Sequence, residues 1–296
     1  MTTWTALTTL AHPAPAHALA GMMEQVLDPA PSGIGCFEIE DGSGRWEVGG
    51  YFERKPDEAA LALLAVLHDA APFTVSRLDD RDWVAQVRRE LHPIEAGRFT
   101  VHGAHDAHRV GPHRIGLSIE AAMAFGTGHH ATTQACLRLI DLLARGGVAG
   151  PGWRPRRVAD IGTGTGVLAM AAARRWHVRV LAGDLDPVAA ETARVNARHN
   201  RVGLTMQAFV AAGLAHPRLR REAPYDLILA NILAAPLRRL APAMRAHLAP
   251  GGYAVLSGLL SVQAPAVEAV YRGHGLRRVR RLVIGTWTSL MLQRPR

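Results

Sequence analysis

The sequence predicts an α/β protein in which a small α+β domain precedes a larger, doubly wound α/β domain. Three observations lead to this prediction. Segments typical of strands and of helices alternate from residue 156 to the C-terminus. The first of these strands runs directly into a glycine-rich turn, DIGTGTG, at residues 160–166. Residues 1–81 instead follow the order strand, helix, hairpin, helix, strand.

The N-terminal elements follow from local patterns. Residues 4–10 alternate as in a half-buried strand, and residues 15–27 carry apolar residues at helical spacing. GCFEIE and RWEVGGYF flank a turn at residues 41–44, which predicts a hairpin. DEAALALLAVLHDA predicts a helix with Asp57 and Glu58 in its first turn, and PFTVSRL predicts the last strand. This order is typical of a ferredoxin-like domain, and it offers no obvious catalytic group.

A connecting stretch separates the two domains. Residues 82–109, DWVAQVRRELHPIEAGRFTVHGAHDAHR, predict a short helix and one strand but no regular alternation. We therefore expect a ferredoxin-like domain at residues 1–81, a linker at 82–109 and the doubly wound domain at 110–296.

The second domain is predicted element by element. RRVADIG, VRVLAGDLD, YDLILANIL and YAVLSGLL are strands, and VLAMAAARR, PVAAETARVNARHN and APLRRLAPAMRAHLAPGG are the helices between them. Asp186 is the expected N-cap of the second of these helices, with Pro187 at its first position. A helix at residues 264–273 and two strands complete the chain. Alternation of this kind is typical of a Rossmann-like sheet with helices on both faces.

Composition limits the classes of protein to which the chain can belong. The net charge is +9, and Lys55 is its only lysine, so the positive charge is almost all arginine. The arginines form short clusters, which we interpret as solvated surface, and we expect no direct nucleic-acid binding. Cys36 and Cys136 form no CxxC pair, which favours a reducing compartment and a cytoplasmic protein. No apolar run approaches the roughly 20 residues of a membrane span.

The glycine-rich turn predicts a nucleotide-type cofactor. Gly162, Gly164 and Gly166 form GxGxG rather than the GxGxxG of nicotinamide dehydrogenases. Asp160 precedes the turn, and Asp184 ends the next strand, 22 residues after Gly162. S-Adenosylmethionine (SAM) fits this pattern, because Asp184 is placed to accept both ribose hydroxyls. Asp160 would orient the turn or meet the SAM ammonium through water. The alternative is a plain glycine turn in an α/β sheet.

Asn231 is the candidate substrate-positioning residue. It lies at the end of a predicted strand, and ligands bind at the carboxyl ends of strands in open α/β sheets. ANILAAP resembles the Asn-Pro-Pro-Tyr-type loop of amino-group methyltransferases, in which amide and backbone oxygens accept hydrogen bonds from the amine. The alternative role is the N-cap of the following helix.

Taken together, these motifs closely resemble the PrmA family, the ribosomal protein L-11 methyltransferases. The resemblance covers most of the chain. Its most specific motif is AFGTGHHATT at residues 124–133, followed in order by DIGTGTGVLAMAA, GDLDP and ANILAAPL. It implies a SAM-dependent methyltransferase domain joined by a linker to a ferredoxin-like substrate-recognition domain. It also implies that Thr133, Gly162, Asp184 and Asn231 contact SAM and that Phe125, Gly126 and Thr127 line its methionine side.

The resemblance implies SAM as cofactor and ribosomal protein L-11 as substrate, methylated at its N-terminal amine and at lysines. We expect a monomer without membrane association. The sequence does not support two further candidate sites, an adenine contact and a metal site. An acid or serine that reads the adenine amino group is expected between residues 205 and 215, and none is clear. Histidines 102, 105 and 108 recur every third residue and residues 129 and 130 are both histidine, but no metal-binding frame surrounds them, so we expect no metal.

The predicted mechanism is positioning. Holding an amine in line with an activated methyl group contributes up to about 7–11 kcal/mol in ideal cases. We find no convincing general base, so we predict that Asn231 and backbone carbonyls position the substrate amine. Three alternatives stay open: a lysine methyltransferase of another protein such as the electron-transfer flavoprotein β subunit, a nucleic-acid amino-methyltransferase, and a SAM-binding module without turnover.

Overall fold

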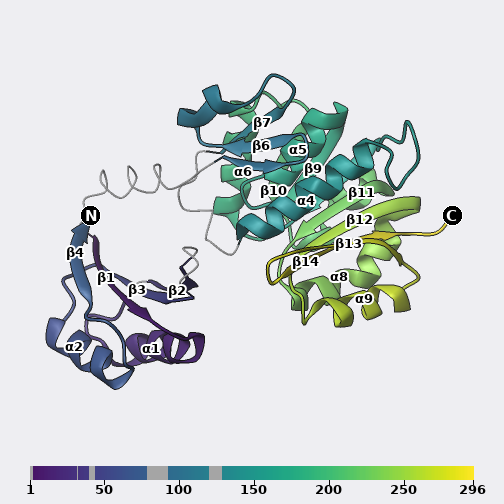
Figure 1. The fold of residues 1–296 in the computed structure, drawn as a ribbon. Coiled ribbons are helices and arrows are strands. Elements are labelled where there is room, and N and C mark those ends of the chain that lie inside the picture. Colours follow the sequence, from purple (N-terminus) through teal and green to yellow (C-terminus); the bar gives the residue numbers. More distant parts are fainter. Residues whose placement is uncertain (1–2, 32, 40–43, 79–92, 120–128) are drawn as a thin grey trace. The chain divides into compact units, whose positions relative to one another are not determined.

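The computed structural model describes residues 3–31, 33–39, 44–78, 93–119 and 129–296 (Figure 1). The chain forms two compact units, Met1–Glu90 and Leu91–Arg296. Within the described part of the chain, no helix is both long enough and apolar enough to cross a membrane.

The first unit is an antiparallel sheet covered by two helices. Its elements are β1 (Thr3–Leu10), α1 (Pro13–Val26), β2 (Gly33–Glu38), β3 (Trp46–Phe52), α2 (Glu58–Leu67) and β4 (Thr74–Leu78). The strand order is β2-β3-β1-β4, and every pairing is antiparallel. Both helices pack on one face of the sheet (Figure 1), where Leu19, Met23, Leu61 and Phe52 are buried in one core. This topology confirms the ferredoxin-like prediction.

The start of α2 shows how local chemistry sets an element boundary. The side chain of Asp57 accepts hydrogen bonds from the backbone N–H groups of Ala59 at 2.8 Å and Ala60 at 3.4 Å. These groups have no partner inside the helix, so an acidic N-cap both satisfies them and interacts favourably with the helix dipole.

The second unit is built on a seven-stranded sheet. Its elements are β5 (Ile94–Ala96), β6 (Phe99–His102), η1 (Ala104–Arg109), β7 (Ile115–Ser118), α4 (His129–Ala144), β8 (Arg157–Ile161), α5 (Val167–Trp176), β9 (Arg179–Asp184), α6 (Pro187–His199), β10 (Met206–Val210), η2 (Gly213–Ala215), α7 (Pro217–Glu222), β11 (Tyr225–Asn231), α8 (Ala234–His247), β12 (Leu248–Leu260), α9 (Ala264–Gly273), β13 (Arg277–Ile284) and β14 (Trp287–Gln293). The large sheet has the order β10-β9-β8-β11-β12-β14-β13.

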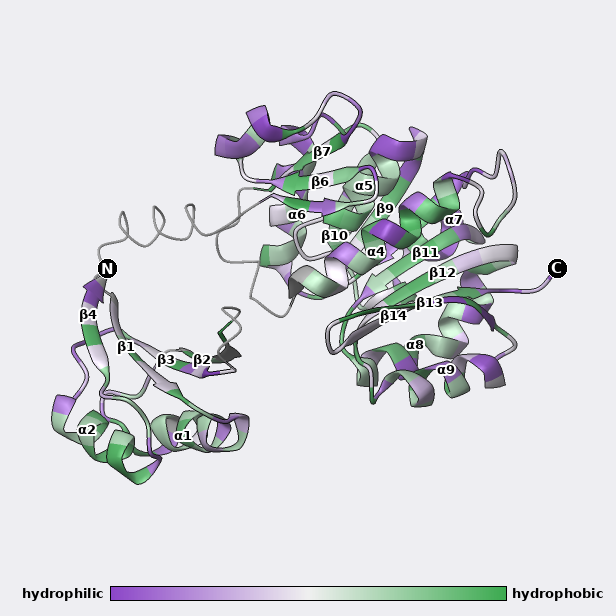
Figure 2. Ribbon diagram, in the orientation of Figure 1, coloured by the Kyte–Doolittle hydropathy of each residue, from purple (hydrophilic) through white to green (hydrophobic). Residues whose placement is uncertain are grey.

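Strands β8 to β12 of this sheet run parallel, whereas β14 is antiparallel to both of its neighbours. Successive residues of β11 point to opposite faces: Leu227 and Leu229 join one core, and Ile228 and Ala230 join the other. Helices α4, α5 and α6 contribute to the first core, and α8 and α9 contribute to the second. The middle strands are correspondingly hydrophobic (Figure 2). Two covered faces confirm the predicted doubly wound, Rossmann-like domain.

The connectivity of the sheet places its ligand crevice. From β8 the chain proceeds to β9 and β10 on one side, and it then returns to β11 and β12 on the other. Strands β8 and β11 are direct neighbours, with Ile161 opposite Ala230 at their carboxyl ends. This is the point where the strand order reverses, and ligands of doubly wound sheets bind there.

Residues 94–109, which lie in the predicted linker, form strands β5 and β6 and the short helix η1. With β7 they make a three-stranded sheet, and Phe99 and Val101 are buried in the same core as α4 and α5. Strands of three or four residues are too short for periodicity to reveal them. The linker is predicted to hold one short helix and one strand, and its described part holds the short helix η1 and two strands. The division at residues 81 and 109 therefore stays a proposal.

Candidate functional site

The glycine loop joins β8 to α5 in a conformation that suits glycine. Gly162, Gly164 and Gly166 have φ values of +70°, +54° and +83°, a region that costs other residues about 1–2 kcal/mol. The N–H groups of Gly162 and Thr163 both donate to the carbonyl of Gly183, at 2.8 and 3.1 Å. The loop is thereby fixed to the end of β9, the neighbouring strand.

The three glycines differ in what surrounds them, which leads to a prediction. A Cβ at Gly162 would clash with Cγ2 of Ile232, whereas a Cβ at Gly164 would meet no described atom within 4 Å. We expect Gly164→Ala to cost only the backbone strain of about 1–2 kcal/mol. Gly162→Ala adds a steric clash in a packed region and should cost clearly more. Urea unfolding of the two variants tests this, and equal stabilities would contradict it.

Asp184 links the glycine loop to the end of β9. Its Oδ2 accepts the N–H of Gly164 at 2.8 Å, and its Oδ1 accepts the N–H of Asp186 at 3.1 Å. The side chain is half-buried. Each carboxylate oxygen has a second lone pair, so Asp184 retains the capacity to accept two further hydrogen bonds. A vicinal diol such as a ribose supplies two donors at suitable spacing.

Asp160 supports the loop from inside the fold. Its Oδ2 accepts the hydroxyl of Thr163 at 2.7 Å and the N–H of Ala169 at 3.2 Å, while its Oδ1 has no hydrogen-bond partner among the described residues. Burial raises the pKa of Asp160 from 3.8 to about 7, and the charge of Asp184 adds to the increase. The bonds from Thr163 and Ala169 oppose this shift. Asp160 therefore orients the loop.

The raised pKa of Asp160 predicts a pH-dependent stability. Protonated Asp160 stabilises the fold fully below pH 3.8, and this contribution is lost as pH rises through about 7. Relative to Asp160→Asn, which cannot ionise, the wild-type protein should lose roughly 2–3 kcal/mol of unfolding free energy between pH 5 and pH 8. Urea unfolding of both proteins at the two pH values measures the difference. Parallel pH profiles would show that this carboxyl titrates normally.

Asn231 ends β11, the strand beside β8, and lies opposite Ser257 of β12. Its Nδ2 donates to Oγ1 of Thr132, in the first turn of α4, at 3.3 Å. The N-cap of α8 is Leu233, so Asn231 does not cap that helix, contrary to the alternative role that its sequence position allows. Ile232, the next residue, lies against Gly162, which brings Asn231 close to the glycine loop.

Of the remaining predicted site residues, the structure describes one and leaves three outside the described part. Thr133 is buried in the first turn of α4, directly after the threonine that contacts Asn231. Phe125, Gly126 and Thr127 lie outside the described residues. Thr132 is a contact that the sequence analysis missed, and its position beside Thr133 in the HHATT run is the only signal the sequence gives.

The adenine contact has no side-chain candidate. Strand β10 pairs with β9 so that Val210 lies opposite Asp184, and the residues that follow Val210 are alanines, glycine and leucine. The histidines serve local structure: Nδ1 of His102 bonds the carbonyl of Gly103 at 2.8 Å, and Nε2 of His105 lies 3.1 Å from Asp106. The described residues include no group of three or more metal-ligating side chains.

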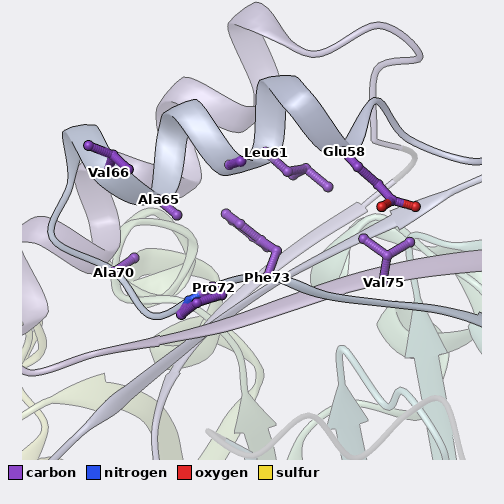
Figure 3. Close-up of a pocket in the computed structure, with 9 residues that line it drawn as sticks. Glu58, Leu61, Ala65, Val66, Ala70, Pro72, Phe73 and Val75 are labelled. Carbon is purple, nitrogen blue, oxygen red and sulfur yellow. The ribbon is translucent and has the colours of Figure 1, made fainter.

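A separate depression of about 440 Å³ lies wholly within the first unit (Figure 3). It is lined mainly by apolar side chains, namely Leu61, Ala65 and Val66 of α2 and Pro72, Phe73 and Val75 of the following segment. Figure 3 shows Phe73 projecting toward α2. The one acid there, Glu58, pairs with Lys55 at 2.6 Å on the surface. This surface suits contact with another molecule rather than catalysis.

Comparison with known proteins identifies the relatives of the chain. It matches the family "Ribosomal protein L11 methyltransferase (PrmA)" over residues 33–295. Proteins of that name from Bradyrhizobium diazoefficiens and Rhodopseudomonas palustris are 44% and 45% identical, over 95% and 94% of this chain and 94% and 93% of theirs. A crystal structure of ribosomal protein L11 methylase from Lactobacillus delbrueckii subsp. bulgaricus superposes with a TM-score of 0.57, at 26% identity, over 70% of this chain and 99% of that one.

Proposed function

The chain belongs to the ribosomal protein L11 methyltransferase (PrmA) family, and we propose that it transfers methyl groups from SAM to amino groups of ribosomal protein L11. The acceptors are the N-terminal α-amine and lysines. The observation that carries the proposal is the relationship to proteins of this name along almost the whole chain, both units included. A ribosomal protein as substrate places the reaction in the cytoplasm.

Several site residues suit SAM, which supplies an electrophilic methyl group on a sulfonium. We propose that the ribose diol bonds Asp184, which has acceptor capacity left after binding Gly164 and Asp186. Gly162 and Gly164 let the backbone approach the cofactor closely. Oδ1 of Asp160, which has no hydrogen-bond partner among the described residues, suits the cofactor's ammonium through a water molecule. Thr133, Asn231, Phe125, Gly126 and Thr127 complete the proposed binding set.

Asn231 and nearby backbone carbonyls position the substrate amine. A neutral nitrogen has to present its lone pair to the methyl carbon, so its N–H groups must be held by acceptors on the other side. An α-amine has a pKa of roughly 7.7–8 and is partly neutral at pH 7, whereas a lysine near 10.4 is not. Lysine acceptors therefore have to lose a proton as they leave water, a change that burial near the sheet edge favours.

We propose that the first unit recognises the protein substrate through the exposed apolar face of α2. Val66 is 81% exposed, and Leu63 and Leu67 are also exposed on this helix. Val66→Glu is expected to raise the KM for L11 about tenfold, equivalent to about 1.4 kcal/mol, and to leave the Kd for SAM unchanged. Leu204→Glu, at a 99% exposed apolar residue of the second unit, is the matched control. Equal KM values for the two variants would show that α2 does not contribute to recognition of the substrate.

The proposed function is tested by transfer of tritiated methyl groups from SAM to purified L11. Parallel reactions offer the electron-transfer flavoprotein and ribosomal RNA as acceptors. Label on L11 alone supports the proposal, and amino-acid analysis of the labelled protein then locates the methylated amines. Label only on another acceptor would keep methyl transfer and reject L11. Cofactor binding without label on any acceptor would favour a SAM-binding module without turnover.

A further inference from the structure

The orientation of the Asn231 carboxamide is set by a residue on another element. Nδ2 of Asn231 donates to Oγ1 of Thr132 on α4. The donor and the acceptor of a carboxamide lie in one plane, on opposite sides of the Cβ–Cγ bond, and the two orientations differ by a half turn about that bond. With Nδ2 directed at Thr132, Oδ1 is directed away from α4. In this orientation, which the bond to Thr132 stabilises, Asn231 offers an oxygen rather than an NH₂ group to an incoming amine.

Thr132 is itself held by buried hydroxyl groups. Oγ of Ser257 on β12 donates to the carbonyl of Thr132 at 3.4 Å and shares a 2.6 Å hydrogen bond with Oγ of Ser289 on β14. Thr132 is 1% exposed, and both serines are fully buried. Cys136, one turn further along α4, is also buried, and burial raises the pKa of its thiol to about 12, so it stays neutral. A satisfied network at such low dielectric resists rearrangement.

The backbone beside Asn231 is fixed by the same part of β12. The N–H of Ile232 donates to the carbonyl of Ser257 at 3.2 Å. Gly258 has a φ of +82°, and a Cβ there would overlap the carbonyl oxygen of Ile232. Ser257 therefore bonds both the backbone of Ile232 and the carbonyl of Thr132, and Gly258 gives the Ile232 carbonyl the space it needs.

We propose that Thr132 is a positioning residue for methyl transfer, which fixes Asn231 with Oδ1 toward the substrate amine, and that Ser257 and Ser289 hold Thr132 in place. The proposal rests on the proposed function, because it assumes that Asn231 accepts a hydrogen bond from the amine. Without the threonine hydroxyl, the carboxamide of Asn231 can rotate by a half turn and present its own N–H groups to those of the substrate amine. Thr132 acts through Asn231 and need not touch the substrate.

The first test compares Thr132→Val, which keeps the shape but removes the hydroxyl, with Thr132→Ser, which keeps the hydroxyl. Thr132→Val should lower kcat for L11 about tenfold, the effect of one hydrogen bond, with the Kd for SAM unchanged. Thr132→Ser should stay within about twofold of wild type on the same reasoning. Thr288→Val is the matched control: Thr288 is fully buried and its hydroxyl bonds Ser261 at 2.9 Å, outside this network.

A double-mutant cycle shows whether Thr132 acts through Asn231. The tenfold effect of Thr132→Val should vanish in an Asn231→Ala background, because no carboxamide is left to orient. An equal loss in both backgrounds, or a wild-type kcat for Thr132→Val while Asn231→Ala is impaired, would overturn this inference alone. A wild-type kcat for Asn231→Ala would overturn both the inference and the proposed role of Asn231. If Thr132→Val does not fold, Thr132→Ala against Thr132→Ser provides the same comparison.

Discussion

Replacing Asp184 by alanine is expected to weaken SAM binding severely and to lower methyl transfer with it. A carboxylate that accepts both ribose hydroxyls makes two charge-assisted hydrogen bonds, each contributing about 1.5–3 kcal/mol. Their loss weakens binding by roughly 10²–10⁴-fold. The variant also loses the bond from Gly164 that ties the glycine loop to β9, which acts in the same direction. Calorimetric titration with SAM or S-adenosylhomocysteine measures the Kd directly.

The neighbouring acid Asp186 provides the control. Its side chain accepts the N–H of Val188 at 2.8 Å and caps α6, so Asp186→Ala should cost about 1 kcal/mol of stability. Because Asp186 has no proposed contact with SAM, the Kd of Asp186→Ala for SAM should remain within about twofold of the wild-type value. If Asp186→Ala lost as much affinity as Asp184→Ala, the effect would reflect disorder at the end of β9 rather than a specific contact with the ribose.

Much of the fold could be predicted because its elements are long and locally consistent. The strand before the glycine loop, the helix after it and the strand ending at Asp184 all follow from apolar runs and turn residues. Asp186 and Pro187 mark the start of α6, and the structure shows the predicted capping bond. Topology followed as well, because alternating strands and helices leave few arrangements other than a doubly wound sheet.

The site could be predicted only where sequence position implies spatial position. Gly162, Asp184 and Asn231 lie at or just beyond the ends of parallel strands, which converge on one edge of the sheet. The contact between Thr132 and Asn231 spans 99 residues, and the one between Ser257 and Thr132 spans 125. Long-range hydrogen bonds of this kind are decided by tertiary packing and leave no periodic pattern in the sequence. In the linker the sequence predicts one strand where the structure has two, β5 and β6, and it does not predict β7, because strands this short leave no clear pattern.

Replacing Asn231 by alanine is expected to lower kcat by about 10²–10³-fold, the usual effect of removing one preorganised polar group at the reacting centre. The Kd for SAM should rise less than in Asp184→Ala, although Asn231 is also a proposed cofactor contact, because the glycine loop and Asp184 remain intact. The two variants should therefore differ in which quantity changes most: the Kd for SAM in Asp184→Ala and kcat in Asn231→Ala. Single-turnover transfer at saturating SAM distinguishes them. A loss of SAM binding in Asn231→Ala equal to that of Asp184→Ala would make Asn231 a cofactor residue only.

Asn231→Asp refines this prediction through pH. An aspartate still offers an oxygen to the amine, but its charge favours the protonated amine and raises that amine's pKa. The variant should retain more activity than Asn231→Ala, and its rate should reach a plateau at a higher pH than that of the wild type. The sign follows because transfer requires the neutral amine, and more hydroxide is then needed to form it. A pH–rate profile that coincides with the wild-type curve would mean that residue 231 does not contact the amine whose proton is lost.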